Sequence, residues 1–362
     1  MFSKRVLWNA PVNELTCERR KRGELLDLTE TNPTRAGIAY PQGELADALA
    51  RGAYASYDPD PRGLRSAREA LAIELQCDPD DLLLTSSTSE AYSFLFKLLA
   101  DPGDVVLTAT PSYPLLEHLA QLELVQLRTF AMEFHRRWEL HLERRALSPS
   151  NTRAIVVINP NNPTGSFVTP QEQDALAEHG VPIISDEVFL PYPLEGNGTT
   201  FVRDDILTFT LGGLSKSAGL PHFKLAWIRV SGPGKREALE ALELIADNFL
   251  SVATPVQTAL PELLRIASRI REAISARTRA NLATLHRTFE SVPSARVLPV
   301  EGGWSAVIRL PRTHEDDLAL ALLDRGVLVQ PGYFFDFESE GHIVVSLLTA
   351  EDVFAAGVER LK

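Results

Sequence analysis

The sequence predicts an α/β fold, with a mostly parallel seven-stranded sheet between helices in a large domain, plus a smaller α+β domain. Helical patterns separate several of the predicted strands, for example at 90–99 and 170–178. Continuously apolar strands with helices between them are typical of a parallel sheet that is covered on both faces. The predicted strands are seven short apolar segments at 82–85, 105–108, 125–130, 154–158, 182–185, 208–211 and 225–230.

The C-terminal part of the chain predicts the smaller domain. A long amphipathic stretch, at 235–248 and then 255–289, leads into it. Short strands at 305–310, 327–330 and 343–347, with a helix at 315–325 and another near the end, indicate a mixed α+β arrangement. We expect the first forty or so residues to cross to this part. The predicted domains are therefore residues 45–255 on one side, and residues 1–44 with 256–362 on the other.

Composition and charge limit the classes of function. The chain has 362 residues, of which 44% are hydrophobic and 23% charged, as in an ordinary globular protein. The net charge of -12 argues against nucleic acid or an anionic membrane as a partner. The basic run 19–22 predicts a solvated helix face or turn, with a phosphate contact as the alternative. Cys17 and Cys77 lack metal-ligand spacing, and neither a signal peptide nor a membrane span is evident, so we expect a cytoplasmic protein without a metal site.

Three polar motifs follow predicted strands. They are Asn-Pro-Asn-Asn-Pro-Thr-Gly at 159–165, Ser-Asp-Glu-Val-Phe at 185–189 and Gly-Gly-Leu-Ser-Lys at 212–216. Ligands bind at the carboxyl ends of strands in such sheets. Asn162 can hydrogen-bond a ring oxygen, Asp186 can pair with a protonated ring nitrogen, and Lys216 can form a Schiff base. A lysine Schiff base with an acidic partner for a pyridinium nitrogen is typical of a protein that holds pyridoxal phosphate.

Two of these residues also have a simpler interpretation. Lys216 could be a surface lysine in a Gly-Ser loop, and Asp186 could be a helix N-cap. The segment before Lys216 does not fit a nucleotide-binding P-loop, because Ser215 rather than glycine precedes the lysine.

With the three motifs in this order, the chain resembles the class I/II, fold-type I aminotransferases from about Asn32 to the C-terminus. The resemblance implies a homodimer that binds pyridoxal 5'-phosphate through Lys216. It also implies that Tyr113 stacks on the cofactor ring, although packing is the simpler role, and that Tyr57 reaches the phosphate of the neighbouring subunit. The family's phosphate cup corresponds to Ser87, Thr88 and Ser89. These residues also fit an ordinary helix N-cap series in which Glu90 completes a capping box. A phosphate site and an N-cap are compatible at the same turn.

The chain departs from the family at the cofactor. Lys224 stands where the family usually has an arginine that clamps the phosphate, and lysine loses the bidentate geometry. Gly213 replaces a serine of the phosphate site, for which Ser215 is a possible substitute. Phe189 replaces a tyrosine that donates to the ring hydroxyl, which leaves Asn162 as the expected partner of that oxygen.

The largest departure concerns the substrate. The family arginine that binds the substrate α-carboxylate corresponds to Val344, which cannot make that contact. Arg35 lies with Asn32 in the N-terminal segment that usually lines the substrate side, and is our first candidate replacement; an exposed loop arginine is the alternative. His342 is a weaker candidate. Otherwise the donor is an amine that lacks an α-carboxylate.

The leading interpretation of function is a transaminase that moves an amino group from an amino acid or amine donor to a keto acid or aldehyde. Another reaction of the same cofactor remains open, such as β-elimination, decarboxylation or an oxidase-type path, because fold does not fix function. A non-catalytic cofactor-binding protein is the third interpretation. The expected partners are a small-molecule donor and acceptor and a second copy of the chain.

Overall fold

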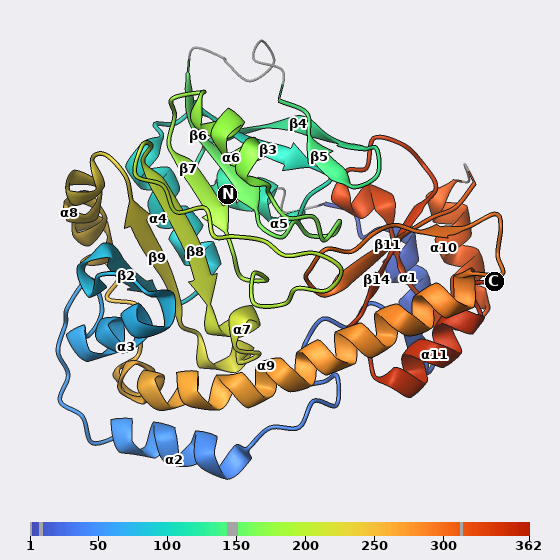
Figure 1. Cartoon of the computed structure of the whole chain (residues 1–362), viewed down its shortest axis with the longest axis horizontal. Helices are drawn as coiled ribbons and strands as arrows, with labels where there is room; N and C mark the ends of the chain where they lie inside the picture. The colour runs from blue at the N-terminus through green and yellow to red at the C-terminus, as the bar shows by residue number, and fades with distance from the viewer. Residues whose placement is uncertain (1, 7–9, 143–150, 312–313) are drawn as a thin grey trace.

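The computed structural model describes residues 2–6, 10–142, 151–311 and 314–362. Within these residues, a main sheet has eight strands in the order β2-β9-β8-β7-β6-β3-β4-β5 (Figure 1). The strands are β2 Leu82–Thr85, β3 Val105–Thr110, β4 Gln126–Phe134, β5 Trp138–Leu140, β6 Thr152–Ile158, β7 Ile183–Asp186, β8 Thr208–Gly213 and β9 Ala226–Ser231.

The centre of the main sheet is parallel. Strands β4, β3, β6, β7 and β8 pair in parallel, whereas β9 is antiparallel to both β8 and β2. All seven predicted strands are present, with slightly shifted ends. The predicted number is one too low, because β5 forms a short antiparallel pair with β4. Its three residues, Trp-Glu-Leu, are too few and too polar to stand out as an apolar run.

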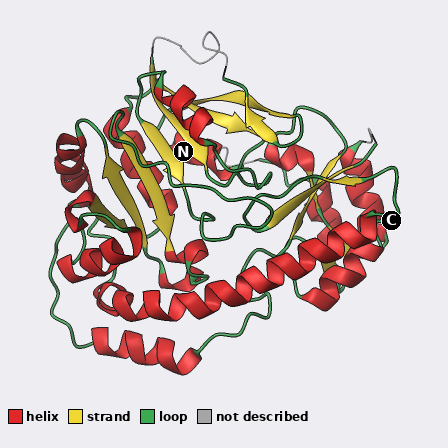
Figure 2. Ribbon diagram, viewed as in Figure 1, coloured by secondary structure: helices red, strands yellow, loops and turns green. Residues whose placement is uncertain are grey.

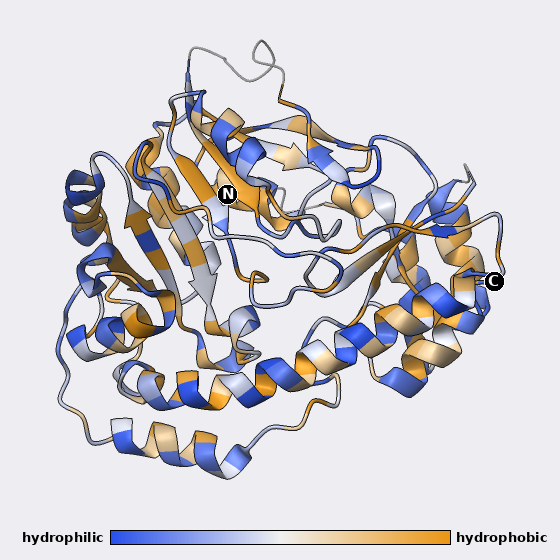
Figure 3. Cartoon of the chain, in the orientation of Figure 1, coloured by the Kyte–Doolittle hydropathy of each residue, from blue (hydrophilic) through white to orange (hydrophobic). Residues whose placement is uncertain are grey.

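Helices cover both faces of the main sheet, as Figure 2 shows. One face packs against α4 Thr88–Leu99, α5 Leu115–Leu122 and α8 Lys235–Ala246. The other face packs against α3 Arg65–Leu75, α6 Pro170–Ala177, α7 Leu214–Ser217 and the first part of α9 Thr254–Phe289. The central strands are largely hydrophobic, and hydrophobic and hydrophilic residues alternate along α9 (Figure 3). Burial on both faces thus explains the uninterrupted apolar runs of the sequence.

A second sheet lies at the far end of α9 and has the order β10-β11-β14-β13. Its strands are antiparallel: β10 Arg296–Val297, β11 Ser305–Arg309, β13 Gln330–Pro331 and β14 His342–Ser346. The nearby helices are α10 Glu315–Asp324 and α11 Glu351–Glu359, and short 3₁₀ turns occur at Pro79–Asp81, Pro221–Phe223 and Gly332–Phe335. The elements predicted from the C-terminal sequence are therefore present.

The N-terminal segment contacts this second sheet region. It contains α1 Glu14–Arg20 and β1 Leu26–Asp27, and β1 pairs in parallel with β12 Val327–Leu328. The chain then returns along the main sheet region through α2 Gln42–Gly52, which packs on α9 (Figure 1). Residues 28–41 consequently run from the second sheet region to α2, and Arg277 of α9 donates to the Ala36 carbonyl on the way. Among the described helices, none combines the length and the apolar composition that crossing a bilayer requires.

Candidate active site

Three neighbouring parallel strands, β6, β7 and β8, bring the predicted polar motifs together. Ile158 pairs with Asp186, and Asp186 pairs with Leu211, so the carboxyl ends of the strands lie side by side. The loop that carries Asn162 follows β6, Asp186 ends β7, and Lys216 lies in α7 directly after β8. The backbone N–H of Asn159 also donates to the carbonyl of Asp186, at 2.8 Å. The sheet therefore gathers these groups at one edge.

Asp186 is a buried acid with few partners. It is 8% exposed and accepts hydrogen bonds from the Tyr92 hydroxyl at 3.1 Å and from the Val188 N–H at 3.2 Å. Burial raises the pKa of Asp186 to about 6, against these hydrogen bonds and the charge of Lys216, which lower it. The next helix, α7, begins only at Leu214, so the N-cap interpretation of Asp186 is wrong. Such a carboxylate needs a cationic partner to stay ionised.

Lys216 is a partly buried amine in α7. Burial lowers the pKa of Lys216, while the carboxylates of Asp186 and Glu30 oppose the shift. The backbone is fixed by the Tyr192 hydroxyl, which donates to the Lys216 carbonyl at 2.8 Å. The surface-loop interpretation of Lys216 is therefore wrong, and a desolvated lysine is a better nucleophile than a free one.

An aromatic wall closes the space beside Lys216. The lysine Nζ lies 5.4 Å from the centroid of the Trp304 ring, within the range of a cation–π contact. Trp304 is 2% exposed and makes edge-to-face contacts with Phe189 at 5.2 Å and Tyr192 at 5.1 Å. These rings thus cover one side of the lysine. Phe189, which stands where the family has a tyrosine, is thus a packing partner of Trp304.

Asn162 is held between the two sheets. The Ser305 hydroxyl, at the start of β11, donates to Asn162 Oδ1 at 3.3 Å. The neighbouring Asn161 is buried and donates to the Pro111 carbonyl at 3.0 Å. Because the loop is tied on both sides, the Asn162 amide is presented to the site with its oxygen already partly satisfied.

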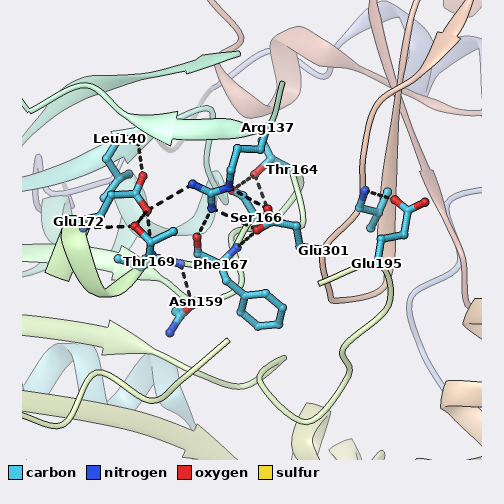
Figure 4. Close-up of polar contacts among 12 residues, drawn as sticks. Arg137, Leu140, Asn159, Thr164, Ser166, Phe167, Thr169, Glu172, Glu195 and Glu301 are labelled. Atoms are coloured by element: carbon cyan, nitrogen blue, oxygen red, sulfur yellow. Dashed lines mark hydrogen bonds and ion pairs between the residues drawn. The ribbon is translucent and has the colours of Figure 1, made fainter. Parts of the chain in front are cut away.

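An arginine network ties this loop to the second sheet (Figure 4). Arg137 Nε lies 2.8 Å from Glu301 Oε1, and the same guanidinium reaches Glu172 and the Phe167 carbonyl. The Phe167 N–H donates to Glu301 Oε2 at 2.8 Å. Glu301 immediately precedes the glycine pair before Trp304, and Phe167 closely follows the Asn162 loop. Arg137 thereby connects the two segments that carry Asn162 and Trp304.

The predicted phosphate cup is the first turn of α4. Ser87 is the N-cap and accepts from the Glu90 N–H at 3.2 Å, and Thr88 and Ser89 begin the helix. The capping box expected at Glu90 is only half formed, because the Glu90 carboxylate accepts from Ser86 rather than from Ser87. Free N–H groups at a helix start bind anions.

Lys224 and Gly213 flank this turn. Lys224 is exposed, has a left-handed φ of 52°, and lies just before β9, which pairs with the strand that leads to Ser87. A side chain at Gly213 would bring its Cβ to 3.0 Å from Ala226 Cβ, so close packing explains the glycine. Lys224 is thus an exposed cation near the start of α4.

The predicted aromatic and substrate residues are less enclosed. Tyr113 is 46% exposed, and burial together with the charge of Asp186 raises its pKa, which sets it near that acid. Tyr57 is 70% exposed and lies beside Ser251 in a shallow hollow away from Lys216. Arg35 is exposed, and Asn32 accepts hydrogen bonds from the Thr34 N–H and hydroxyl.

Neither Val344 nor His342 offers a cation at the place of the missing arginine. Val344 is fully buried in a cluster with Val307, Leu298 and Phe335. His342 is 3% exposed and stacks on Phe337, with ring centroids 4.5 Å apart. Burial lowers the pKa of His342, so its imidazole is a poor cation for a carboxylate.

Sequence reasoning missed four residues of the site: Tyr92, Tyr192, Trp304 and Glu30. Tyr92 lies one turn after Thr88, so the helical spacing of α4 could have indicated it. The other three reach Lys216 from distant segments, and no local pattern signals them.

The chain is similar in sequence to known proteins. The chain matches the family described as aminotransferase class I and II over residues 22–358. It is 32% identical to nicotianamine aminotransferase 1 of Oryza sativa subsp. japonica over 61% of this chain and 48% of that protein. It is also 32% identical to an S-alkyl-thiohydroximate lyase of Arabidopsis thaliana over 62% of this chain and 52% of that protein. The chain thus spans about half the length of these two relatives.

The fold is similar to that of a solved alanine aminotransferase from Pyrococcus furiosus, with a TM-score of 0.89. The two share 22% identity, and the match covers 99% of this chain and 98% of the other. At that identity the likeness establishes the fold alone.

Proposed function

This chain belongs to the aminotransferase class I and II family, and from that premise we propose that it moves an amino group from an amino acid or amine donor to a keto acid or aldehyde. The family depends on pyridoxal phosphate. When bound, the cofactor supplies an aldehyde that takes up the amino group and a protonated ring that withdraws electrons from the reacting carbon.

The residues of the site fit this cofactor. The observation that carries the proposal is the pairing of Asp186 and Lys216 in one desolvated space at the ends of β7 and β8. Asp186 has donors on two sides but lacks a full cationic partner, and a pyridinium nitrogen supplies one. Lys216 is the amine that binds the aldehyde carbon.

Each residue of the site is assigned a separate role in the reaction. Lys216 Nζ, once released by the donor, takes the proton from the donor's reacting carbon. Asp186 keeps the ring nitrogen protonated, and Tyr92 holds Asp186 in position. Asn162 donates its amide N–H to the ring oxygen, since its Oδ1 already accepts from Ser305. Trp304 excludes water from the lysine.

The phosphate and the ring face take the remaining roles. We assign the phosphate to the start of α4, where Ser87, Thr88 and Ser89 offer backbone and hydroxyl donors, with Lys224 as the cation. Tyr113 is assigned to the ring face.

We further propose a homodimer that acts in the cytoplasm. Tyr57 is too exposed to serve its own Lys216, and the resemblance assigns it to the phosphate of the neighbouring subunit. A domain division at residues 45–255 against 1–44 and 256–362 is supported by the pairing of β1 with β12. Sedimentation of the purified chain tests the dimer.

A lyase is the second candidate, since one relative of about equal similarity is named as a lyase. The two activities differ in stoichiometry. A transaminase that is given a donor without an acceptor forms an amount of carbonyl product equal to the amount of protein and then stops. A lyase continues and releases ammonia.

The test is a single-turnover assay of the cofactor-loaded protein with a panel of donors. We expect a carbonyl product equimolar with protein, and further turnover only after a keto acid or aldehyde is added. Lys216→Ala abolishes the product, whereas Lys235→Ala, which removes a surface lysine paired with Asp81, does not. Continuous ammonia release establishes the lyase instead, and no response to any donor establishes a non-catalytic protein.

A further inference from the structure

The charges around Lys216 are unusual for a site that binds a carboxylate. The charged side chains that act on Lys216 are two acids, Asp186 and Glu30, and the charged group that acts on Asp186 at attractive range is Lys216 itself. Asp186 and Lys216 both have roles toward the cofactor. Glu30 has none, so one negative charge remains on the substrate side.

Glu30 is fixed at this place by its neighbours. Its carbonyl accepts from the Ser346 hydroxyl at 2.6 Å, and its carboxylate Oε1 accepts from the Asn32 N–H at 2.7 Å. The side chain is partly buried, and the other carboxylate oxygen has no hydrogen bond to a described residue. Glu30 can therefore accept from a ligand without breaking its own contact.

A closed set of contacts joins Glu30 to the cofactor lysine. Ser346 pairs with Ser305 in the second sheet, and Ser305 donates to Asn162. The residue before Ser305 is Trp304, whose ring lies against Lys216 Nζ at 5.4 Å. These contacts place Glu30 on the same side of the site as Asn162 and Lys216, and we assign the donor to that side.

No hydrogen bond or ion pair joins Glu30 to a cation among the described residues. The position of the carboxylate-binding arginine is Val344, buried among Val307, Leu298 and Phe335. Arg35 is exposed to solvent, and Lys224 lies at the phosphate end beside α4. A carboxylate next to the reacting carbon would meet Glu30 without a compensating charge, and like charges at close range are strongly unfavourable where water is excluded.

Resting on the proposed aminotransferase function, we propose that Glu30 binds the donor, and that the donor is a primary amine with a second positive charge in place of an α-carboxylate, that is, a diamine. One amino group would displace Lys216 from the aldehyde carbon of the cofactor, and the other pairs with the free oxygen of Glu30. In the overall exchange the donor amine becomes an aldehyde and the acceptor carbonyl becomes an amine, so no other oxidant is needed. Because donor and acceptor occupy the same space in turn, aldehydes are better acceptors than 2-oxo acids.

The test uses donors that differ only in the carboxylate. Butane-1,4-diamine is compared with ornithine, and pentane-1,5-diamine with lysine, in the single-turnover assay of the cofactor-loaded protein. We expect each diamine to react at least about tenfold faster than its amino acid at equal, subsaturating concentration, which is the effect of one charge pair of modest strength. Faster reaction of the amino acids overturns the proposal and leaves the aminotransferase function standing.

A variant assigns the preference to Glu30. Glu30→Gln keeps an oxygen for the Asn32 N–H and removes the charge, so the rate ratio of butane-1,4-diamine to butylamine falls about tenfold. Glu24→Gln, an exposed glutamate of the same segment, leaves the ratio unchanged. Tetramethylated butane-1,4-diamine cannot transfer an amino group, so its affinity can be measured by calorimetry. We expect this affinity to fall in Glu30→Gln and to stay unchanged in Glu24→Gln. An unchanged ratio and affinity in Glu30→Gln overturn the proposal, whereas failure of every donor, with or without a carboxylate, overturns the aminotransferase function on which it rests.

Discussion

The hydroxyl of Tyr92 donates a hydrogen bond of 3.1 Å to Oδ2 of Asp186, from the second turn of α4 to the end of β7. Tyr92 is 5% exposed, so the bond is protected from water. It joins the helix that begins with the proposed phosphate cup to the acid that we assign to the cofactor ring nitrogen. A change in either element is therefore transmitted to both ends of the cofactor.

The first prediction concerns this bond. Tyr92→Phe leaves the packing of the ring in place but removes the donor, and this disfavours the ionised form of Asp186. We expect the affinity for pyridoxal phosphate to fall at least about tenfold, as for a lost hydrogen bond to a charged group. The dissociation constant is measured by fluorescence titration of the cofactor-free protein. Phe96→Leu, a buried change on the same helix without a polar contact, is the control for altered packing. Equal affinities of Tyr92→Phe and wild type would show that the hydroxyl does not support Asp186.

The second prediction follows from the pKa of Asp186, which burial raises to about 6 from the ordinary 3.8. In the cofactor-free protein, the folded state then holds a proton that the unfolded state has lost between these two values. The contribution of Asp186 to the free energy of unfolding is therefore retained below about pH 4, falls as pH rises towards 6, and is flat above that. The loss is on the order of 3 kcal/mol.

Asp186→Asn removes this titration, so the comparison isolates it from other carboxyl groups. The difference in unfolding free energy between the variant and wild type is measured in urea at several pH values without cofactor. We expect the unfolding free energy of the variant, relative to that of wild type, to increase between pH 4 and pH 6. A difference that is independent of pH contradicts the raised pKa.

Much of this arrangement could be predicted from the sequence, because it depends on local pattern. The apolar runs at β6, β7 and β8 indicated parallel strands, and Asn162, Asp186 and Lys216 each follow one of them. Their meeting is then a consequence of parallel pairing. The start of α4 was likewise visible in its hydroxyl residues.

The rest depends on contacts between distant segments. Glu30, Tyr192 and Trp304 approach Lys216 only because the N-terminal segment and the second sheet fold back onto the end of β8. The strand β5 escaped prediction because its stability comes from pairing with β4 rather than from its own residues. Hydrophobic periodicity reports which face of an element is buried, and carries no information about which distant side chain covers it.

The third prediction concerns Arg137, whose side chain is 22% exposed and contacts Glu301, Glu172 and the Phe167 carbonyl. Arg137→Ala leaves the acceptors unpaired and frees the segments of Asn162 and Trp304. We expect a loss of about 2 kcal/mol in unfolding free energy and a lower kcat, with Arg137→Lys in between. Urea unfolding and steady-state kinetics measure the two effects.

Arg203 supplies a matched control, because it pairs with Asp174 and Asp205, whose side chains are 69% and 60% exposed. Arg203→Ala costs less than about 1 kcal/mol and leaves kcat unaltered. If Arg137→Ala changes the unfolding free energy and kcat as little as Arg203→Ala does, the Arg137 network does not position Asn162.

The fourth prediction concerns the cation of the phosphate cup. Lys224→Arg restores a planar fork that can bind phosphate through two hydrogen bonds, so we expect about threefold to tenfold tighter binding of pyridoxal phosphate. Lys224→Ala weakens binding by at least about tenfold. Lys235→Arg, a change at a surface lysine that is paired with Asp81, serves as the control in the same titration. Unchanged affinity in both Lys224 variants would place the phosphate elsewhere.

The most direct test of the account is the identity of the lysine that holds the cofactor. Borohydride treatment of the cofactor-loaded protein fixes pyridoxal phosphate to its lysine, and mass mapping of the peptides then locates it. We expect a single modified peptide, the one that contains Lys216, and none in Lys216→Ala. Modification at another lysine, or no modification in a protein that still binds the cofactor, would contradict the assignment of the site.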